Sequence, residues 1–341
     1  MVNIPKIIHL TCPDKHNIDN PIWKKCLEQY KSMYSDYEII IYDDNDIFNI
    51  IKEHFPNYFE KIKRIKKGAV LADLFRYLIL YIKGGIYSDL DCFPIKRIDE
   101  LLKPNFKYYH GTHENIYFIY TNKQKIINNE WDFYYNICNN CKKISQKNLN
   151  YPIKMQCLGH SLEDFSTILG YEFHSDYHPS DVVNNKKWCY KNVGICQWFI
   201  ITEPKQDIFA KIFNNILRNL DNILDGLAII DNAENNKELE ISREDIQKLH
   251  TNVIKTTGPT AFTKVVMDNL NDKIKILPCD FFCSGSGDME QFFSQPVPLT
   301  KNSYIKHLFT ASWLPENPSR AAQKVEHKTK EINALLKKYP K

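Results

Sequence analysis

The chain has 341 residues, of which 43% are hydrophobic, 13% aromatic and 25% charged. This composition is typical of a soluble globular protein with a large core, and it excludes a disordered chain, a collagen-like chain and a coiled coil. The 45 basic and 41 acidic residues leave a formal net charge of +4. That charge is too balanced to indicate nucleic acid binding, so we expect no nucleic acid partner.

The sequence shows neither a signal peptide nor a run of about 18 apolar residues long enough for a transmembrane helix. We therefore expect no integral membrane segment and a cytoplasmic protein, in a bacterium, in a host cell or in a virion. The ten cysteines are expected to be free thiols. Cys138-x-x-Cys141 and Cys279-x3-Cys283 are a weaker alternative as halves of a zinc site, because they differ in spacing and lie far apart.

The N-terminal part alternates short β-rich runs with amphipathic segments. Residues 6–10 and 37–42 are predicted as strands, and residues 21–33 and 47–54 as helices, the second ending before Pro56. Asp43 and the residues after it indicate a turn or a helix N-cap. This β-α-β-α order predicts an open α/β sheet of Rossmann type.

The next segment is a strongly apolar helix that starts at residue 67 and stops at Gly84-Gly85. It carries one acidic and one basic residue, Asp73 and Arg76, which share a face because they are three residues apart. A surface ion pair would contribute little to stability. Charges inside an otherwise apolar helix need partners, however, so a functional role is favoured.

A short strand is predicted over residues 86–92, with Asp89 and Asp91 two positions apart. In an extended segment both side chains would point to the same side. Two such carboxylates form a hard oxygen site suited to Mn²⁺ or Mg²⁺. An Asp-x-Asp pair taken alone is more often a solvated turn, so the assignment depends on its context.

The remainder divides into less regular parts. Residues 194–201 are predicted as a strand, 206–220 as an amphipathic helix and 231–243 as a polar loop. The predicted organisation is a single α/β domain over residues 1–341: a half that carries the Asp-x-Asp pair (1–103), an insertion or subdomain (104–190), the rest of the core (191–318) and a basic helical tail (319–341).

The spans 72–77 and 84–91 together resemble the donor site of retaining glycosyltransferases of family 32. This family includes the fungal initiating α-1,6-mannosyltransferases and bacterial capsule sugar transferases. The glucosylating clostridial toxins have the same spacing. Further segments resemble the family in order along the chain: residues 4–9, 196–204, 257–263 and 307–313. The resemblance implies an α/β fold of the GT-A type. In such a single GT-A-like domain, residues 1–103 would be the nucleotide-sugar half, 104–190 an insertion or acceptor subdomain and 191–318 the rest of the catalytic core.

The resemblance also implies roles at the metal and the donor sugar. Asp91 would ligate the metal, and Asp89 would hold the ribose or a metal-bound water. Asp73 and Arg76 would hydrogen-bond hydroxyls of the sugar. His307 would complete the metal or diphosphate shell, although a core or surface histidine is the alternative.

The remaining implied positions concern the nucleotide. Tyr87 would line the nucleoside pocket, Ser312 and Trp313 would donate to the phosphates, and His9 and Gln197 would also contact the donor. Trp313 and Gln197 could instead be core residues. After His9 the family usually has a polar residue and soon an aromatic one, whereas this chain has Leu10-Thr11-Cys12, which leaves UDP and GDP both open.

The sequence therefore predicts a metal-dependent retaining glycosyltransferase. It would move a sugar from a UDP- or GDP-linked donor to a hydroxyl of a glycan, a lipid-linked sugar or a protein. Two alternatives remain: a non-catalytic sugar or nucleotide binder on the same fold, and a metal-dependent phosphoesterase. The second usually needs more carboxylates and two metals.

Overall fold

The computed structural model describes residues 3–102, 109–110, 155–156, 165–174, 193–235, 256–269, 271, 273–277, 279–282, 299, 303–310 and 318–339. Its strands are β1 (Ile7–Thr11), β2 (Glu38–Tyr42), β3 (Gly85–Ser88), β4 (Cys92–Pro94), β5 (Tyr109–His110), β6 (Met155–Gln156), β7 (Thr167–His174), β8 (Val193–Ile195), β9 (Phe199–Thr202), β10 (Ile274–Leu277) and β11 (Ile305–His307). Its α-helices are α1 (Pro21–Met33), α2 (Asp44–His54), α3 (Pro56–Ile62), α4 (Gly68–Lys83), α10 (Asp207–Arg218), α11 (Leu220–Asn235), α13 (Pro259–Asp268), α14 (Cys279–Phe282) and α15 (Pro318–Lys338).

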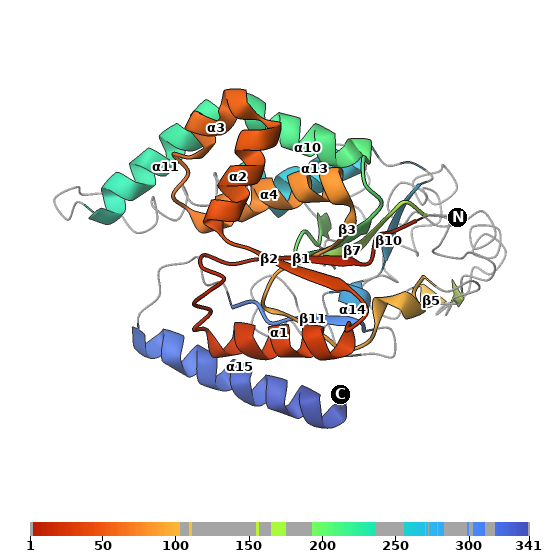
Figure 1. Cartoon of the computed structure of the whole chain (residues 1–341). Coiled ribbons are helices and arrows are strands. Elements are labelled where there is room, and N and C mark those ends of the chain that lie inside the picture. Colours follow the sequence, from red (N-terminus) through yellow and green to blue (C-terminus); the bar gives the residue numbers. More distant parts are fainter. Residues whose placement is uncertain are drawn as a thin grey trace, which may run out of the picture.

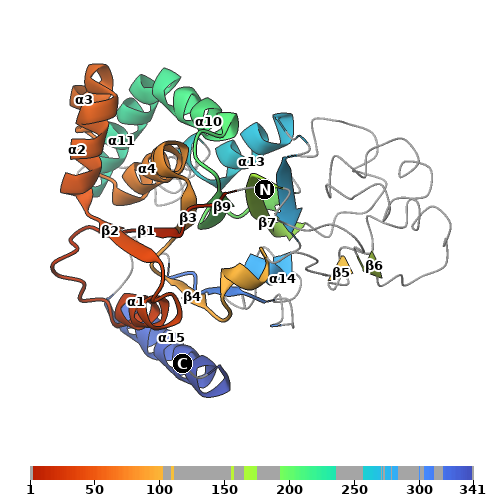
Figure 2. The same cartoon turned by 45° about the vertical axis from the view of Figure 1, so that its right-hand side comes forward.

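Within these residues, seven strands form a central sheet in the order β10-β7-β9-β3-β1-β2, with β8 paired to β7. β3, β1 and β2 run parallel, and β9 is antiparallel to both of its neighbours, β3 and β7. Helices α2, α4, α10 and α13 lie over one face, while α1 and α15 lie on the other (Figures 1 and 2). The predicted α/β class with an open sheet is confirmed.

The predicted N-terminal elements are confirmed, and their ends have local causes. Asn20 accepts hydrogen bonds from the first backbone N–H groups of α1, where Pro21 is compatible with the first helical position. Asp43 caps α2 and forms a reciprocal capping box with Asp46. Capping residues therefore made these boundaries predictable from sequence.

Three predicted elements need correction. The strand expected over residues 86–92 ends at Ser88, because Asp89 starts a turn that the Cys92 N–H closes on the Asp89 carbonyl at 3.0 Å. The strand expected over 194–201 is two strands, β8 and β9, separated by Cys196–Trp198. Helix α11 continues to Asn235, into the polar stretch expected to be a loop; positions 236–243 lie outside the described residues.

The segment 104–190, expected as an insertion, contains β7, which pairs with β9 and β10 in the central sheet. Part of this segment therefore belongs to the core of the fold. Most of the rest lies outside the described residues. The acceptor role and the other domain boundaries stay predictions.

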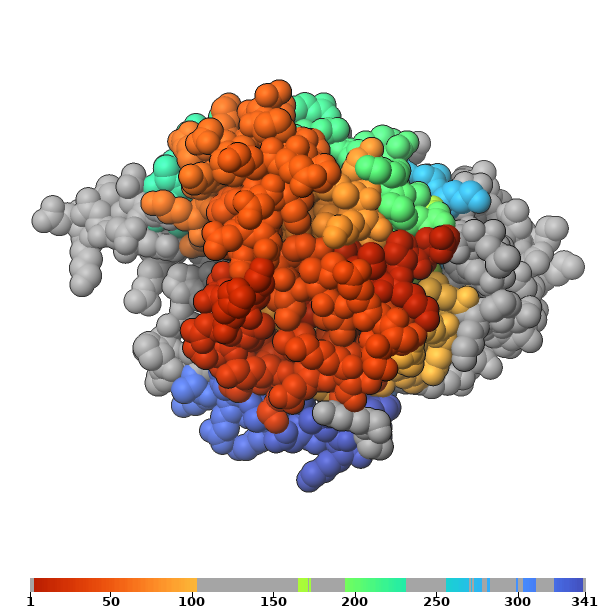
Figure 3. Space-filling view, viewed as in Figure 1, coloured from red at the N-terminus to blue at the C-terminus, as the bar shows by residue number. Residues whose placement is uncertain are grey.

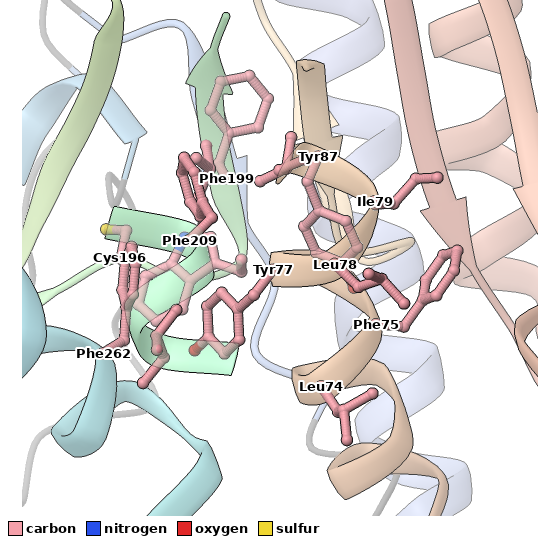
Figure 4. Packing of buried hydrophobic residues seen from close by; sticks show 14 of the residues in the cluster. Leu74, Phe75, Tyr77, Leu78, Ile79, Tyr87, Cys196, Phe199, Phe209 and Phe262 are labelled. Carbon is pink, nitrogen blue, oxygen red and sulfur yellow. The ribbon is translucent and has the colours of Figure 1, made fainter. Parts of the chain in front are cut away.

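The main core lies between α4 and the helices beside it. Tyr77 of α4 stacks on Phe262 of α13 with ring centroids 5.3 Å apart, and Phe209 of α10 stacks on the same Phe262 at 6.5 Å (Figure 4). The predicted buried face of α10 is confirmed, since Ile208, Ile212 and Ile216 are all buried. This packing holds α4 rigidly, and α4 carries the charged pair Asp73 and Arg76.

Of the cysteines in the described part of the chain, Cys12, Cys26, Cys92 and Cys196 are thiols outside any disulfide, as predicted, and all four are buried. Cys279 begins α14, and the other residues of the alternative zinc site lie outside the described ranges. Among the described helices, none is long and apolar enough to span a membrane.

Gly84 ends α4 in a conformation that only glycine adopts readily, with φ 64° and ψ −157°. A Cβ atom there would lie 2.4 Å from the Pro204 nitrogen. Backbone strain and this clash together predict that Gly84→Ala lowers the free energy of unfolding by about 3 kcal/mol or more. Chemical denaturation would measure the loss.

Gly68→Ala is the matched control on the same helix. A Cβ at Gly68 meets nothing within 4 Å, so this change is expected to be neutral or slightly stabilising. Equal losses in the two variants would contradict the assignment of the effect to the backbone conformation of Gly84.

Candidate functional site

The helical charges predicted from sequence form a buried ion pair. Arg76 Nη2 lies 3.0 Å from Asp73 Oδ1, and the exposed fractions of the two side chains are 4% and 8%. A second carboxylate, Asp89, lies 3.4 Å from Arg76 Nη1. The guanidinium also lies over the ring of Tyr87, 4.7 Å from its centroid. Burial of this kind excludes the surface ion pair that was the alternative for Asp73 and Arg76.

Gln197, which lies between β8 and β9, connects these groups. Its backbone carbonyl accepts from Arg76 Nη1 at 2.8 Å, and its side-chain Nε2 donates to Asp73 Oδ1 at 2.9 Å. Its Oε1 accepts from the Tyr77 hydroxyl at 2.7 Å. Thr257 donates to the other oxygen of Asp73 at 3.0 Å. The orientation of Asp73 is therefore determined by two segments remote in sequence.

The predicted site has four charged residues in this region: Asp73, Arg76, Asp89 and Asp91. Asp89 is the most exposed of them, with 30% of its side chain accessible. Its Oδ1 accepts from the Tyr87 hydroxyl at 2.9 Å, and that hydroxyl lies 3.0 Å from Thr11 Oγ1. Its backbone N–H donates to the Trp198 carbonyl at 2.9 Å. These bonds place Asp89 at the carboxyl end of β3, where ligands bind in open α/β sheets.

Asp91 lies on the turn after β3 and is held by residues more than 200 positions away. His307 Nε2 lies 3.1 Å from its Oδ1. The Thr310 backbone N–H and hydroxyl donate to its Oδ2 at 2.9 and 2.8 Å. β11 reaches Asp91 because it pairs with β4, which directly follows the turn.

The His307 ring lies between two aromatic rings, with centroids 4.3 Å from Trp198 and 3.9 Å from Phe309. Its Nδ1 is buried and has no hydrogen-bond partner within the described residues. Ligand atoms of Asp91, Cys92 and His307 all lie within 4.8 Å of one another. These are the residues of the described chain that could share a cation, and Asp89 lies outside this group.

The surroundings shift the pKa values of Asp73 and Asp91 in opposite directions. Burial raises the pKa of Asp73 to about 6, although Arg76 and the donors to Asp73 oppose the shift. Burial also opposes ionisation of Asp91, but His307 and Thr310 outweigh it and hold the pKa of Asp91 well below its usual range. Asp91 is therefore ionised near neutral pH.

His9, predicted to contact the donor, is fully buried on β1. One ring nitrogen, Nε2, lies 2.8 Å from the Gly84 carbonyl, and the other lies 3.1 Å from the Tyr42 hydroxyl. Burial lowers the pKa of His9 to about 4 despite the bond to Gly84. The imidazole thus supports the end of α4 and offers no exposed atom to a ligand.

This buried histidine predicts an acid dependence of stability. Its pKa is about 6.5 in an unfolded chain and about 4 in the folded protein, so the unfolded state binds the proton more readily between these values. Stability is expected to fall as the pH drops from 6.5 to 4, by about 3 kcal/mol from this group.

The comparison variant is His9→Gln, in which the side-chain amide replaces the imidazole and keeps a donor and an acceptor. Asp73, with its raised pKa, acts with the opposite sign over part of this range, but equally in both chains. The difference between the two denaturation curves, measured from pH 7 to pH 4, isolates His9. A difference that does not change with pH would contradict the assignment.

The structure brings together most of the predicted site residues: Asp73, Arg76, Tyr87, Asp89, Asp91, Gln197 and His307. Ser312 and Trp313 lie outside the described residues, so their roles stay predictions. Sequence reasoning missed Tyr77, and it gave no side-chain role to Thr257 and Thr310. Thr257 precedes the Gly-Pro turn and Thr310 follows His307 by three residues, so proximity to recognised segments was the available signal.

The chain matches the family described as glycosyltransferase sugar-binding region containing DXD motif, over residues 21–107. This match includes Asp73, Arg76, Asp89 and Asp91, and it confirms the resemblance drawn from those residues. Gln197, Thr257, His307 and Thr310 lie beyond the matched range.

Two relatives of this chain are fungal glycosyltransferases. Over 99 residues (29% of this chain and 25% of the relative), the chain is 33% identical to mannosyl phosphorylinositol ceramide synthase of Saccharomyces cerevisiae. It is 21% identical to the initiation-specific alpha-1,6-mannosyltransferase of Schizosaccharomyces pombe, over 91% of this chain and 64% of that protein. The chain thus aligns with about a quarter of the first relative and with 64% of the second.

Among solved structures, the catalytic domain of alpha-toxin from Clostridium novyi is similar at 12% identity and a TM-score of 0.38. The similarity covers 96% of this chain and 82% of that domain.

Proposed function

We propose that this chain is a metal-dependent retaining glycosyltransferase. It takes a sugar from a UDP- or GDP-linked donor and transfers it to a hydroxyl of a glycan, a lipid-linked sugar or a protein. The observation that carries the proposal is the direct contact of Arg76 with both Asp73 and Asp89, next to the turn that bears Asp91. The first three of these residues form one ion cluster, and all four lie within the matched sugar-binding region.

The cation site of this proposal is Asp91 with His307. Carboxylate oxygen and imidazole nitrogen suit Mn²⁺, and oxygen ligands suit Mg²⁺. Asp91 Oδ1 and His307 Nε2 lie 3.1 Å apart, so the two residues could hold one cation between them. Burial raises the pKa of the Cys92 thiol well above its usual range, so we do not assign this thiol as a ligand.

The donor sugar is assigned to Asp73 and Arg76. Asp73 accepts hydrogen bonds from Gln197 and Thr257 and forms an ion pair with Arg76. A carboxylate has about four acceptor positions, so capacity is left for a sugar hydroxyl. Asp89 has the exposed carboxylate and is assigned to the ribose or to a metal-bound water.

In the proposed reaction, the bond between the anomeric carbon and the diphosphate oxygen breaks, and the acceptor oxygen bonds to the same face of that carbon. The acceptor proton passes to the departing phosphate oxygen, so no protein side chain is assigned as general base. The cation would stabilise the negative charge of the leaving diphosphate. The preorganised Asp73–Arg76 pair would hold the sugar in position for this exchange.

The test is release of nucleoside diphosphate by the purified chain from a panel of UDP- and GDP-sugars, with Mn²⁺ and with a chelator. Mannosyl donors come first, because the relatives are named as mannosyl enzymes. Metal-dependent release from one donor would support the proposal and identify that donor. Binding of a donor without release, with acceptors of all three classes present, would favour the non-catalytic binder. Absence of both binding and release would contradict the proposal.

A further inference from the structure

The C-terminal helix α15 packs on the strand that carries His307. α15 lies beside α1 on the face of the sheet opposite α4 (Figures 1 and 2), and β11 lies near α1 (Figure 1). In the space-filling view, α15 forms the lower border of the molecule (Figure 3). This helix is separated by sequence and by position from Asp73 and Arg76.

A second hydrophobic cluster, distinct from the main core, joins α15 to the two-stranded β4–β11 sheet. It contains Ile332 and Leu335 of α15, Leu308 directly after β11, and Phe93 and Ile95 in and after β4. Leu308 follows His307 in sequence, and its backbone N–H donates to the Asp91 carbonyl at 3.0 Å. The cluster also contains Ile22 and Cys26 of α1, so α15 and α1 together pack near the segments that follow Asp91 and His307.

A buried ion-pair cluster supplements this packing. Glu331 of α15 pairs with Lys306 of β11, and its other oxygen lies 3.3 Å from Lys328 Nζ. The two lysine side chains are only 7% and 3% exposed. The Glu331 side chain is 22% exposed, and attraction between charges is stronger at such a partly buried site than at the surface.

Lys306 and His307 are consecutive in β11, so their side chains point to opposite faces of the strand. One face is bound by Glu331, and the other presents the imidazole to Asp91. The residue two positions after His307, Phe309, has φ 49°, which is uncommon for a residue other than glycine. Such a conformation persists only where the surroundings hold it, and the Phe309 ring packs against the rings of His307 and Trp198.

We propose that Glu331 is a positioning residue for the cation site: through Lys306 it fixes β11, and thereby the imidazole of His307 against Asp91. This inference rests on the cation site of the proposed function. Glu331 does not touch the cation or the donor. Substitution of Glu331 is expected to weaken metal binding, because mutation of residues that orient metal ligands commonly lowers metal affinity.

The test compares two neutralising substitutions on the same helix. Glu331→Gln removes the buried pair, whereas Glu326→Gln removes the exposed pair of Glu326 with Lys330, whose side chains are 68% and 73% accessible. Mn²⁺ titration is expected to give a Kd about tenfold higher for Glu331→Gln, within the range for such residues, and an unchanged Kd for Glu326→Gln. Lys306→Met, which removes the same pair from the strand side, is expected to match Glu331→Gln.

A metal-free measurement accompanies the titration: NMR of the His307 ring, assigned by comparison with His307→Gln. Its resonances are expected to shift in Glu331→Gln and in Lys306→Met, but not in Glu326→Gln. If both pair-breaking variants keep the wild-type Kd and His307 spectrum, or if the control changes equally, the inference is wrong. A wild-type chain that binds no Mn²⁺ would instead contradict the proposed cation site, and the NMR comparison would still decide whether Glu331 positions His307.

Discussion

Asp91→Asn is expected to reduce metal-dependent release of nucleoside diphosphate by at least about 10²–10³-fold, the usual cost of removing one electrostatic contact to a transition state. Asp91 is held ionised by His307 and Thr310, and the amide removes its charge while keeping its shape. Mn²⁺ affinity is expected to fall with activity, because the site would keep only the imidazole of His307 and lose the carboxylate charge.

Asparagine is preferable to alanine because Asp91 accepts two hydrogen bonds from Thr310. The amide oxygen can still accept them, so the turn is expected to remain folded. Asp221→Asn, on an exposed carboxylate that pairs with Lys61, serves as the control and should retain full release. A folded Asp91→Asn enzyme with wild-type release would show that the cation site has been assigned to the wrong residue.

Arg76→Met is expected to lower the free energy of unfolding by about 3–5 kcal/mol, the usual cost of breaking a buried charge pair from one side. Asp73 and Asp89 would then face each other without the guanidinium between them. We also expect the pKa of Asp73 to rise above 6, because Arg76 is the largest of the groups that lower it. Urea denaturation at pH 7.5 measures the loss, and repetition at pH 5 should show a smaller one.

Arg97→Met is the matched comparison. Arg97 also bridges two carboxylates, Asp36 and Asp99, but its side chain is 34% exposed, and pairs of this kind contribute little. A large loss in Arg76→Met with almost none in Arg97→Met would attribute the effect to burial. Similar small losses in both variants would contradict the view that Arg76 neutralises a desolvated acidic cluster.

The hydrogen bonds of Gln197 determine what this residue can contribute to the site. Gln197 binds Asp73, Arg76 and Tyr77 through three of its polar atoms, so little of its hydrogen-bonding capacity remains for a ligand. Its role in this structure is to orient the charged pair. The sequence analysis instead expected Gln197 to contact the sugar-nucleotide donor directly.

The sequence by itself determined the local features. These features are the apolar run of α4, the glycines at its end, the caps of α1 and α2 and the Asp-x-Asp pair. Each of them depends only on residues near each other in the chain. For the same reason, the three-residue spacing of Asp73 and Arg76 was enough to assign them to one face of a helix. The α/β alternation was also predictable, because it depends on periodicity and turn residues.

Only the tertiary structure decided which remote groups meet. Asp91 is held by His307 and Thr310, and Asp73 by Gln197 and Thr257, across separations of more than 100 residues. His9, expected at the donor, is fully used by Tyr42 and Gly84. These contacts depend on strand order and pairing, about which residue periodicity carries no information. The Asp-x-Asp motif therefore predicted the type of chemistry. The residues that shift the pKa of each carboxylate were identified only by the packing of the sheet and its helices.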